Sequence, residues 1–585
     1  MHMASNHPKK KRLTLFFRLN IPILLCCCIQ IAHAESIDTA LQTVRSWVSD
    51  DFKVPSSTET LPENISGVCV LLWRNGDVLG FGEAFGDSKN LLSEAAKDAF
   101  KQARKHPIIR KLPEDIRHNA LSLIGIEIEI ATQYTPIPTK NLEKAAKKIV
   151  LGIDGIAVRR GNNWDYRFPT HMRLSPFRKT VNHLEGMCIK VGAPPALVIA
   201  HQLPSQEDIT IYKLDVVSAY QHEKGKKVTT LWRGDVLVTT ENIKQVGLHA
   251  LADELASYLI QSVWPGEETI GITGTYQPEI DRLNTVFAPT ISQAMSAEAL
   301  LHYAMMPTPL FKHQALAAYK RIMHDLAFVN EHESPITGVI EQSFVVLASD
   351  DATVLSTEAT EMIANCKIEI VAAAKQMIEG TLVPTKALAR GVLAAAVSHI
   401  ALHDASVLPL AETVIDVCFA TTSHSDRASL IPWIAQASVD VITLGGKVDP
   451  ENIVLLRNNA LASQIIEDDI PDLLGGFSLQ TKSGAVVDAR GIRMVPMLAC
   501  LLPSETFTPR GERAVFLQSL LLASRFTSQL TTTPERACRF ANPSKSVGGV
   551  RNSPWDATMK PEATAMALIG ISEAIEAIKD VAQGN

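Results

Sequence analysis

The period of the hydrophobic pattern changes once along this chain, near residue 240, and this change limits the possible folds more than any other feature. Before it, short apolar runs with period two are mixed with a few helical stripes, which is typical of an α/β domain. After it, Ala- and Leu-rich segments repeat with period 3.6. We therefore expect an α/β domain over 36–236 and an all-α domain over 240–585.

In the first region, the segment 68–81 predicts a β-hairpin, because two apolar runs flank Asn75 and Gly76. An Asn-Gly pair favours the positive φ angles of a tight turn. A helical stripe follows over 90–106. Isoleucines then alternate with other residues, including two glutamates, over 123–130, which predicts a strand with one buried face. We expect further strands at 153–159, 197–201, 209–220 and 228–231.

The second region contains about a dozen helical stretches by its 3.6-residue period. Examples are 242–263, 427–444, 489–502 and 562–582, and the breaks between helices hold Pro, Gly, Ser or Asp. Each stretch is too apolar on one face to be stable alone, so neighbouring helical hairpins must stack. This pattern fits a closed α/α barrel or an open solenoid.

The N-terminus has the pattern of a secretory signal peptide. Positive residues at 9–12 precede an apolar run over 13–31, and Ala-His-Ala at 32–34 is a cleavage site of the small-x-small type. We predict that residues 1–34 are removed and that the mature protein is exported to the periplasm or the outside of the cell, with no stable membrane span. An uncleaved N-terminal anchor stays open as the alternative.

The charge of the chain argues against two kinds of partner. The formal net charge is −6, and the leader holds cations but no acidic residue, so cleavage makes the protein more acidic. This acidic balance argues against nucleic acids and anionic membranes as main partners, because both require a basic face.

The cysteines give no recognisable framework. Of nine, three lie in the leader, and no Cys-x-x-Cys follows it, so zinc-ribbon and thioredoxin-type sites lack their signature. Most of the remaining thiols lie in apolar runs and are expected to be buried, with their disulfide pairing left open. They are Cys69, Cys188, Cys366, Cys418, Cys500 and Cys538.

Several motifs of the first region occur together in one known family. GVCVLLWRNGDVLGFGEAFG, LIGIEIEIATQYTPIPT, GIDGIAVRRGNNWDYRFP and HLEGMCIKVGAPP follow one another in this order. With these motifs the region resembles the AMMECR-type (AMME chromosomal region) domain family, which implies a mixed sheet with helices. The hallmark Leu-Arg-Gly-Cys-Ile-Gly of that family falls on Val78–Glu83, where Phe81 replaces the cysteine. A phenyl ring cannot act as a nucleophile, so the resemblance implies no thiol chemistry here.

Four charged residues of this region are candidates for lining a polar ligand-binding cleft. They are Glu127, Glu129, Arg159 and Arg160. In the alternative interpretation, the two arginines flank a solvated hairpin turn and the two glutamates face water on a half-exposed strand.

Paired glycines recur in the helical region. Gly475-Gly476-Phe477 and Gly548-Gly549-Val550 each lead through a polar loop to an apolar helix, and Gly274-Thr275-Tyr276 resembles a third, decayed copy. Paired glycines allow a loop to turn sharply into a helix. The region resembles the α/α toroid superfamily, which includes terpenoid cyclases, prenyltransferase β subunits and α/α-barrel glycoside hydrolases and lyases. An Asp-rich cyclase motif is missing, which argues against a terpenoid cyclase.

The segment before the last helix has the richest local chemistry. Arg551 and Trp555 are candidates for binding a sugar or an anionic group, and Asp556 and Glu562 are candidates for catalytic acid and base. Alternatively, Glu562 follows Pro561 in a first helical turn, where the helix dipole alone favours a carboxylate.

We predict neither a metal nor a cofactor. His399 and His403 have the spacing of two zinc ligands on one helix, but two ligands do not make a site, and no glutamate lies between them to act as a base. The sequence also contains no Gly-x-Ser-x-Gly elbow, phosphate-binding loop or dinucleotide fingerprint.

Three hypotheses about function follow. The preferred one is an exported ligand-binding or scaffolding protein of the cell envelope, whose ligand is a carbohydrate or another small molecule. The first alternative is a polysaccharide lyase or glycoside hydrolase that acts in the toroid funnel. The second alternative is a protein-interaction platform of stacked hairpins, with an unknown protein partner. Whether the protein is an enzyme stays open at this point.

Overall fold

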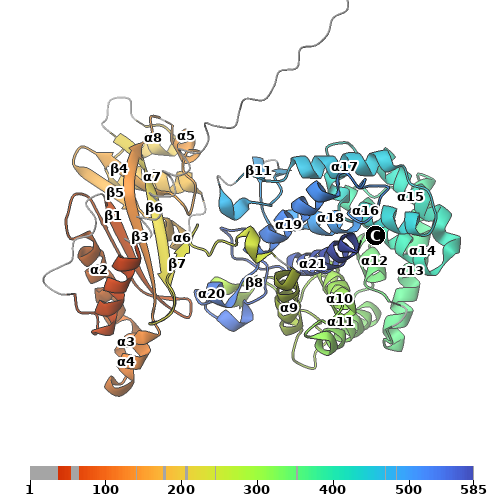
Figure 1. Ribbon diagram of the computed structural model, residues 1–585, viewed down its shortest axis with the longest axis horizontal. Helices are drawn as coiled ribbons and strands as arrows, with labels where there is room; N and C mark the ends of the chain where they lie inside the picture. Colours follow the sequence, from red (N-terminus) through yellow and green to blue (C-terminus); the bar gives the residue numbers. More distant parts are fainter. Residues whose placement is uncertain are drawn as a thin grey trace, which may run out of the picture. The chain divides into compact units, whose positions relative to one another are not determined.

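The chain forms two compact units. One reaches to Gly234, apart from the turn at 74–77, and the other starts at Asp235. Figure 1 colours the first unit red to yellow and the second green to blue. The predicted signal peptide lies outside the residues that the computed structural model describes. These residues are 37–54, 65–139, 141–175, 179–203, 209–243, 245–350, 353–467, 470–481 and 484–583.

A sheet with helices forms the first unit, as the sequence predicts, but the strand pairs β1–β3, β3–β6, β4–β5, β4–β6 and β6–β7 are all antiparallel, whereas the family resemblance implies a mixed sheet. In the order β2-β1-β3-β6-β4-β5, neighbouring strands are hydrogen-bonded, and β7 also pairs with β6. The strands are β1 (Gly67–Arg74), β2 (Asp77–Phe85), β3 (Gly125–Pro136), β4 (Gly155–Arg160), β5 (Asn163–Arg167), β6 (Ile209–Gln221) and β7 (Thr229–Leu231).

Strand β3 is buried on both faces, whereas the alternation predicts only one buried face. Ile126, Ile128 and Ile130 pack in a core shared with the helix at 37–49 and with α2. On the opposite face, Glu127 and Glu129 are each only 1% exposed. The expectation that these glutamates face water is therefore wrong. The reason is that β3 is a central strand with an element packed on each face, which its own sequence does not reveal.

Short helices complete this unit. One segment departs from expectation: the sequence predicts a strand at 197–201, but α8 occupies it, because Pro195 provides the fixed φ of a first helical turn. A second core joins α5, α7 and α8 to β4 and β6. The helices after 37–49 are α2 (Leu91–Lys105), α3 (Pro107–Arg110), α4 (Glu114–Ser122), α5 (Leu142–Ala146), α6 (Pro169–Leu174), α7 (Thr180–Lys190) and α8 (Pro195–Ile199).

Helical hairpins form the second unit. Inner helices alternate along the chain with outer helices. The inner ones are α10 (Thr290–Met305), α12 (Val339–Leu347), α14 (Ala387–His403), α16 (Trp433–Thr443), α18 (Met494–Leu501) and α21 (Pro561–Ala582). The outer ones are α9 (Gln245–Ser262), α11 (Lys312–His332), α13 (Thr357–Ile378), α15 (Leu408–Thr421), α17 (Pro450–Ala462) and α19 (Arg513–Leu530).

The inner helices close into a ring. Each contacts the next in chain order, and the last, α21, packs against the first, α10. This contact joins segments separated by most of the unit, so the helices form a closed α/α toroid and not an open solenoid. Smaller elements decorate the loops: α20 (Pro534–Ala537) and the strand pairs β8 (Tyr276–Gln277) with β9 (Arg282–Leu283) and β10 (Leu479–Thr481) with β11 (Gly484–Val486).

The paired glycines mark a repeated loop between an outer and an inner helix. After α17, the chain returns so that Phe477 forms a β-bridge with Gln464, just beyond the end of that outer helix. After α19, Val550 forms the equivalent bridge with Thr531. Gly475 and Gly548 have φ angles of +85° and +83°. A Cβ atom at Gly475 would lie 1.8 Å from the carbonyl oxygen of Leu522 on α19, so no other residue fits there.

The third copy of this loop has a different register from the predicted one. After α9, the equivalent pairing joins Val263 to Ile272. By this register Gly271, with φ +68°, corresponds to the second glycine of each pair, Gly476 and Gly549, and Gly274 corresponds to neither glycine. The sequence offers two glycines here, and only the pairing to α9 decides between them.

The described cysteines form no disulfide with one another, and all except Cys500 are buried. No helix among the described residues is long and apolar enough to cross a membrane.

Candidate functional site

The interior of the toroid carries titratable side chains between apolar ones. Each of them is half-buried. They are Glu298 and His302 on α10, His399 on α14, Asp440 on α16, Cys500 on α18 and Glu573 on α21. Glu298, Asp440 and Glu573 are called the carboxylate cluster below.

The three carboxyl groups of the cluster lie within electrostatic range through Glu573, because the charges of Glu298 and Asp440 both act on it. The helices α16 and α21 are not neighbours in the ring, since α18 lies between them. Asp440 and Glu573 therefore interact electrostatically across the ring interior. The charges of both also act on the Cys500 thiol on α18.

Burial raises the pKa of all three carboxyl groups. Burial raises the pKa of Asp440 to about 6, although hydrogen bonds oppose the shift. Burial raises the pKa of Glu298 to about 8. Burial, and then the charges of Glu298 and Asp440, raise the pKa of Glu573 well above its usual value. At neutral pH the cluster therefore holds an ionised Asp440 and a protonated Glu298.

The hydrogen bonds of the cluster are unequal. Asp440 accepts a hydrogen bond from Gln436 at 3.0 Å and one from Ser398 of the adjacent helix α14 at 3.3 Å. Glu573 Oε2 is a buried atom with no hydrogen-bond partner among the described residues. Burying a carboxyl atom without a partner costs stability, and such atoms are characteristic of functional sites.

The predicted histidine pair lies on α14, where the neighbouring Ser398 donates to Asp440. The rings of His399 and His403 are 5.5 Å apart between centroids and nearly perpendicular. His399 Nε2 donates to the carbonyl oxygen of Ser349 at 3.1 Å, and burial lowers the pKa of its imidazole to about 4. Within the described ranges, no group of three or more His, Cys, Asp and Glu side chains is arranged to hold a metal ion.

The predicted acid and base, Asp556 and Glu562, lie in the loop before α21 and in its first turn. Asp556 accepts hydrogen bonds from the backbone N–H of Thr558 and the side chain of Asn552, which fold the loop on itself. Glu562 accepts a hydrogen bond from the Ser292 hydroxyl of α10 at 2.9 Å. These contacts stabilise the loop and the helix start, and the catalytic role of both residues stays a prediction.

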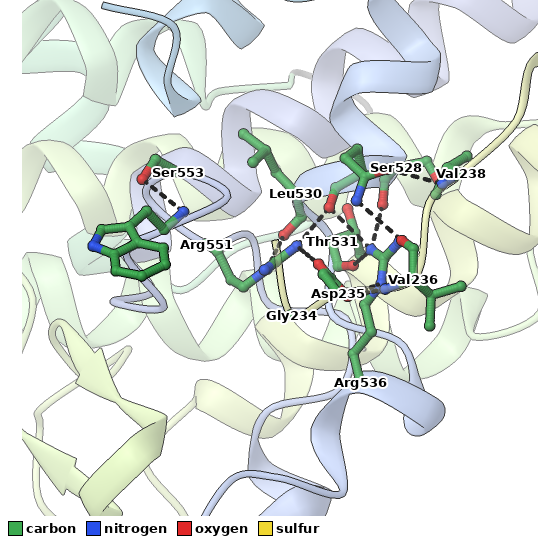
Figure 2. Close-up of polar contacts among 12 residues, drawn as sticks. Gly234, Asp235, Val236, Val238, Ser528, Leu530, Thr531, Arg536, Arg551 and Ser553 are labelled. Carbon is green, nitrogen blue, oxygen red and sulfur yellow. Dashed lines mark hydrogen bonds and ion pairs between the residues drawn. The ribbon is translucent and has the colours of Figure 1, made fainter. Parts of the chain in front are cut away.

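The sequence predicts that Arg551 and Trp555 bind a ligand together. Arg551 is 7% exposed and forms an ion pair with Asp235, the first residue of this unit. Figure 2 shows Asp235 between Arg551 and Arg536. Burial would raise the pKa of Asp235, but the two guanidinium groups lower it overall. The Arg551 guanidinium is thus already engaged in an ion pair within the protein. The Trp555 indole nitrogen is buried without a hydrogen-bond partner among the described residues.

In the first unit, Glu127 and Glu129 lie next to each other on β3 with well-defined partners. Trp73 and Arg173 donate to Glu127, each at 3.1 Å, and the backbone N–H of Thr170 donates to Glu129 at 3.0 Å. Burial, and then the charge of Glu127, raise the pKa of Glu129 to about 8. The structure therefore brings the two glutamates together in a closed polar core.

Arg159 and Arg160 lie apart from these glutamates, at the end of β4. The Arg159 guanidinium lies over the Trp164 ring, 5.3 Å from its centroid, and the exposed side chain also donates to Gly161. Arg160 donates to the carbonyl oxygen of Gly192. A ligand-binding role for either arginine stays a prediction.

Sequence reasoning missed the carboxylate cluster. Its signal was present but weak: Glu298, Asp440 and Glu573 each interrupt a helical segment that is otherwise apolar or small on nearly every side. A carboxylate on the buried face of a helix is rare unless it is paired or functional. The segments alone could not show that the three carboxylates meet.

Comparisons with known proteins add little beyond the fold. No protein-family model matches this chain, and no curated protein matches it either. Three solved structures are similar to parts of it. An uncharacterized protein of Pyrococcus horikoshii matches with 19% identity over 34% of this chain and 97% of its own, with a TM-score of 0.26.

Two further structures match over the larger part of the chain. An unsaturated glucuronyl hydrolase specific for heparin matches with 10% identity over 57% of this chain and 99% of its own, with a TM-score of 0.43. An inactive variant of the α-1,6-mannanase of Salegentibacter sp. HEL1_6, in complex with α-1,6-mannotetrose, matches with 9% identity over 56% and 99%, with a TM-score of 0.41. At such low scores, the assignment of a toroid rests on the helix contacts of this chain itself.

Proposed function

We propose that the helical unit is a carbohydrate-active domain that binds a saccharide in the toroid interior and cleaves a glycosidic bond with the carboxylate cluster. The observation that carries this proposal is that the charges of Glu298 and Asp440 both act on Glu573 across the ring, while the pKa values of Asp440 and Glu298 lie on either side of neutrality. Glycoside hydrolases commonly use two carboxyl groups with different pKa values, one protonated as the acid and one ionised as the base.

The separated pKa values assign the roles. Asp440, with a pKa of about 6, is ionised at pH 7 and acts as the base that takes a proton from the attacking water. Glu298, with a pKa of about 8, is protonated at pH 7 and gives its proton to the leaving glycosidic oxygen. Water then adds to the sugar, so one proton is taken and one is given in each turnover.

A substitution series in the full chain tests this proposal on a panel of neutral and acidic polysaccharides, with release of reducing ends as the measurement. Asp440→Asn and Glu298→Gln keep the size of each side chain and should lower kcat by about 10²–10⁴-fold. Asp556→Asn and Glu562→Gln are matched controls that should keep most of the activity. Loss of activity only in these controls would move the active site to the loop before α21.

The pH dependence of the rate gives a second test. We expect a bell-shaped profile with limbs near pH 6 and pH 8, from Asp440 and Glu298. Because the carboxylates are coupled, the limbs belong to the cluster and not to single residues. An unsaturated product would indicate elimination, as in a lyase. Saccharide binding without turnover would return the protein to the ligand-binding hypothesis, and neither binding nor turnover on the whole panel would refute the proposal.

Export to the cell envelope is a separate part of the proposal and is supported by the leader sequence at 1–34 alone. Fractionation of cells that produce the full chain tests it. We expect the mature protein in the periplasm or the medium, starting at Glu35 by N-terminal sequencing. An unprocessed N-terminus in the cytoplasmic fraction would contradict it.

A further inference from the structure

The inner helices of the toroid begin at one common end. Inner and outer helices alternate along the chain, so the inner helices all run in the same direction. The loops before α10, α18 and α21 are also hydrogen-bonded to one another. Tyr276 pairs with Met559, and the backbone N–H of Ala489 donates to the carbonyl oxygen of Asn552. This end is called the N-terminal end of the toroid below.

Trp433, the first residue of α16, lies on the inward face of this end. It precedes Asp440 by seven residues, or two helical turns, so both side chains lie on one face about 10 Å apart along the helix axis. Trp433 also packs edge-on against Phe344 of α12, with 5.6 Å between the ring centroids. Because α14 lies between α12 and α16, this contact also reaches across the interior. The indole is only half-buried there.

Arg493 lies at a similar depth on the neighbouring inner helix. It directly precedes α18 with helical backbone angles, and Cys500 follows seven residues later. The Cys500 thiol faces the interior, since the charges of Glu573 and Asp440 act on it. The spacing of two turns therefore places Arg493 on the inward face of α18. Because α16 and α18 are adjacent, Arg493 and Trp433 lie on neighbouring inner helices at the N-terminal end.

The Arg493 guanidinium has no partner of its own. Among the described residues it forms neither an ion pair nor a hydrogen bond, and its Nε is buried. The nearby Asp488 is already paired with Arg490 at 2.7 Å. Burial, and then the charge of Arg490, lower the pKa of Arg493. The side chain is partly exposed, and its two terminal nitrogens keep access to solvent, so an anion can reach them.

We propose that the toroid binds an acidic polysaccharide, with one uronate carboxylate held by the terminal nitrogens of Arg493 and the same sugar unit packed on the Trp433 indole. The planar fork of a guanidinium matches a carboxylate, and an aromatic ring packs against the C–H face of a sugar. An ionised Asp440 repels an anionic group beside it, which favours the carboxylate two helical turns away. This inference rests on the proposed saccharide binding in the toroid.

Isothermal titration of the full chain carrying Asp440→Asn, which should bind without rapid cleavage, tests the inference. The probes are polygalacturonate, alginate and hyaluronan, each beside its carboxyl-reduced form, which keeps the linkages and lacks the charge. At least one acidic polymer should bind about 10–100-fold more tightly than its reduced form, as expected for hydrogen bonds to a charged group. Binding of no acidic polymer, or equal binding of both forms of each, would overturn the inference.

Variants in the same background assign the contacts. Arg493→Gln should weaken binding of the acidic polymer about 10–100-fold and leave that of the reduced form unchanged. Trp433→Ala should weaken both forms equally, because packing on a ring does not depend on the charge of the sugar. Arg510→Gln, which removes an exposed charge from the loop after α18 at the opposite end, is the matched control and should change neither.

The stability of Arg493→Gln separates ligand binding from a structural role. Its Tm should not fall, because no contact with a described partner is lost. A lower Tm, or an unchanged preference for the acidic polymer, would overturn the inference.

Cleavage by the unsubstituted chain tells this inference apart from the proposed function. Equal cleavage of acidic and reduced polymers would leave glycoside cleavage standing and refute the role of Arg493. Binding of the acidic polymer through Arg493 without any cleavage would refute glycoside cleavage alone.

Discussion

The two units bury carboxylates in opposite ways. In the sheet, Glu127 accepts a hydrogen bond from Trp73 and forms an ion pair with Arg173, which compensates its charge. In the toroid, Glu573 has a buried oxygen without a described partner and lies beside other carboxylates. Burial alone therefore does not identify a functional acid. What distinguishes the toroid is that the charged neighbours of Glu573 are themselves carboxyl groups, which raise its pKa, whereas an arginine offsets the charge of Glu127 in the sheet.

The largest effect is expected from removing the partner of the sheet glutamate. Arg173→Ala leaves the Glu127 carboxylate buried and uncompensated, which should cost about 3–5 kcal/mol. Amide hydrogen exchange of β3 peptides in the full chain measures this loss separately from the toroid. Arg159→Ala is the matched control and should cost under about 1 kcal/mol, because it removes only exposed contacts, with the Trp164 ring and the carbonyl oxygen of Gly161. Equal losses in the two variants would show that the sheet glutamates are not held by compensation.

A smaller effect of opposite sign is expected in the toroid. The pKa of Glu298 is raised from 4.5 to about 8, so between these values the unfolded chain releases a proton that the folded chain keeps. Stability therefore falls as the pH rises through this window. Glu298→Gln cannot ionise and should stabilise the toroid by about 2 kcal/mol at pH 8.5, after allowance for partial exposure, and by nothing at pH 4.

Thermal unfolding of both proteins at these two pH values measures the difference. A Tm of Glu298→Gln that equals that of the unsubstituted chain at pH 8.5 would contradict the raised pKa. A difference of the same size at pH 4 would point to packing instead of charge.

The smallest effect is expected at the second sheet glutamate. Glu129, with a pKa of about 8, is already protonated at pH 7, and an amide oxygen can accept the same Thr170 N–H. Glu129→Gln should therefore change stability by less than about 1 kcal/mol at pH 7. Hydrogen exchange of β3 measures this change. A cost comparable to that of Arg173→Ala would show that Glu129 carries a charge in the folded protein.

Local patterns predicted many elements of the fold. The expected helices at 242–263 and 562–582 correspond to α9 and α21. Others differ where tertiary contacts intervene: the predicted helix at 489–502 is a 3-10 segment followed by α18, and β5 was missed, because Asn163–Arg167 has a polar sequence and pairs with β4 through its backbone. Periodicity reports burial of side chains and therefore does not register a polar edge strand.

The candidate sites were less predictable than the fold. The resemblance drew attention to Val78–Glu83, and Phe81, Gly82 and Glu83 line a cavity of the first unit. The ion pair of Asp165 with Lys190 gave no local signal, because it joins β5 to α7. The carboxylates of the toroid were missed for the same reason, since each is a single polar residue until the ring closes.

By itself, the sequence determined where the period changes, which segments become helices, and that paired glycines end the loops before inner helices. These are consequences of residues a few positions apart, whose side chains share a face or whose backbone needs a positive φ. Only the tertiary structure decided that α21 closes on α10 and that β2 approaches β5. Such contacts depend on how whole elements pack, so the chemistry of residues distant in sequence emerges only when the chain is folded.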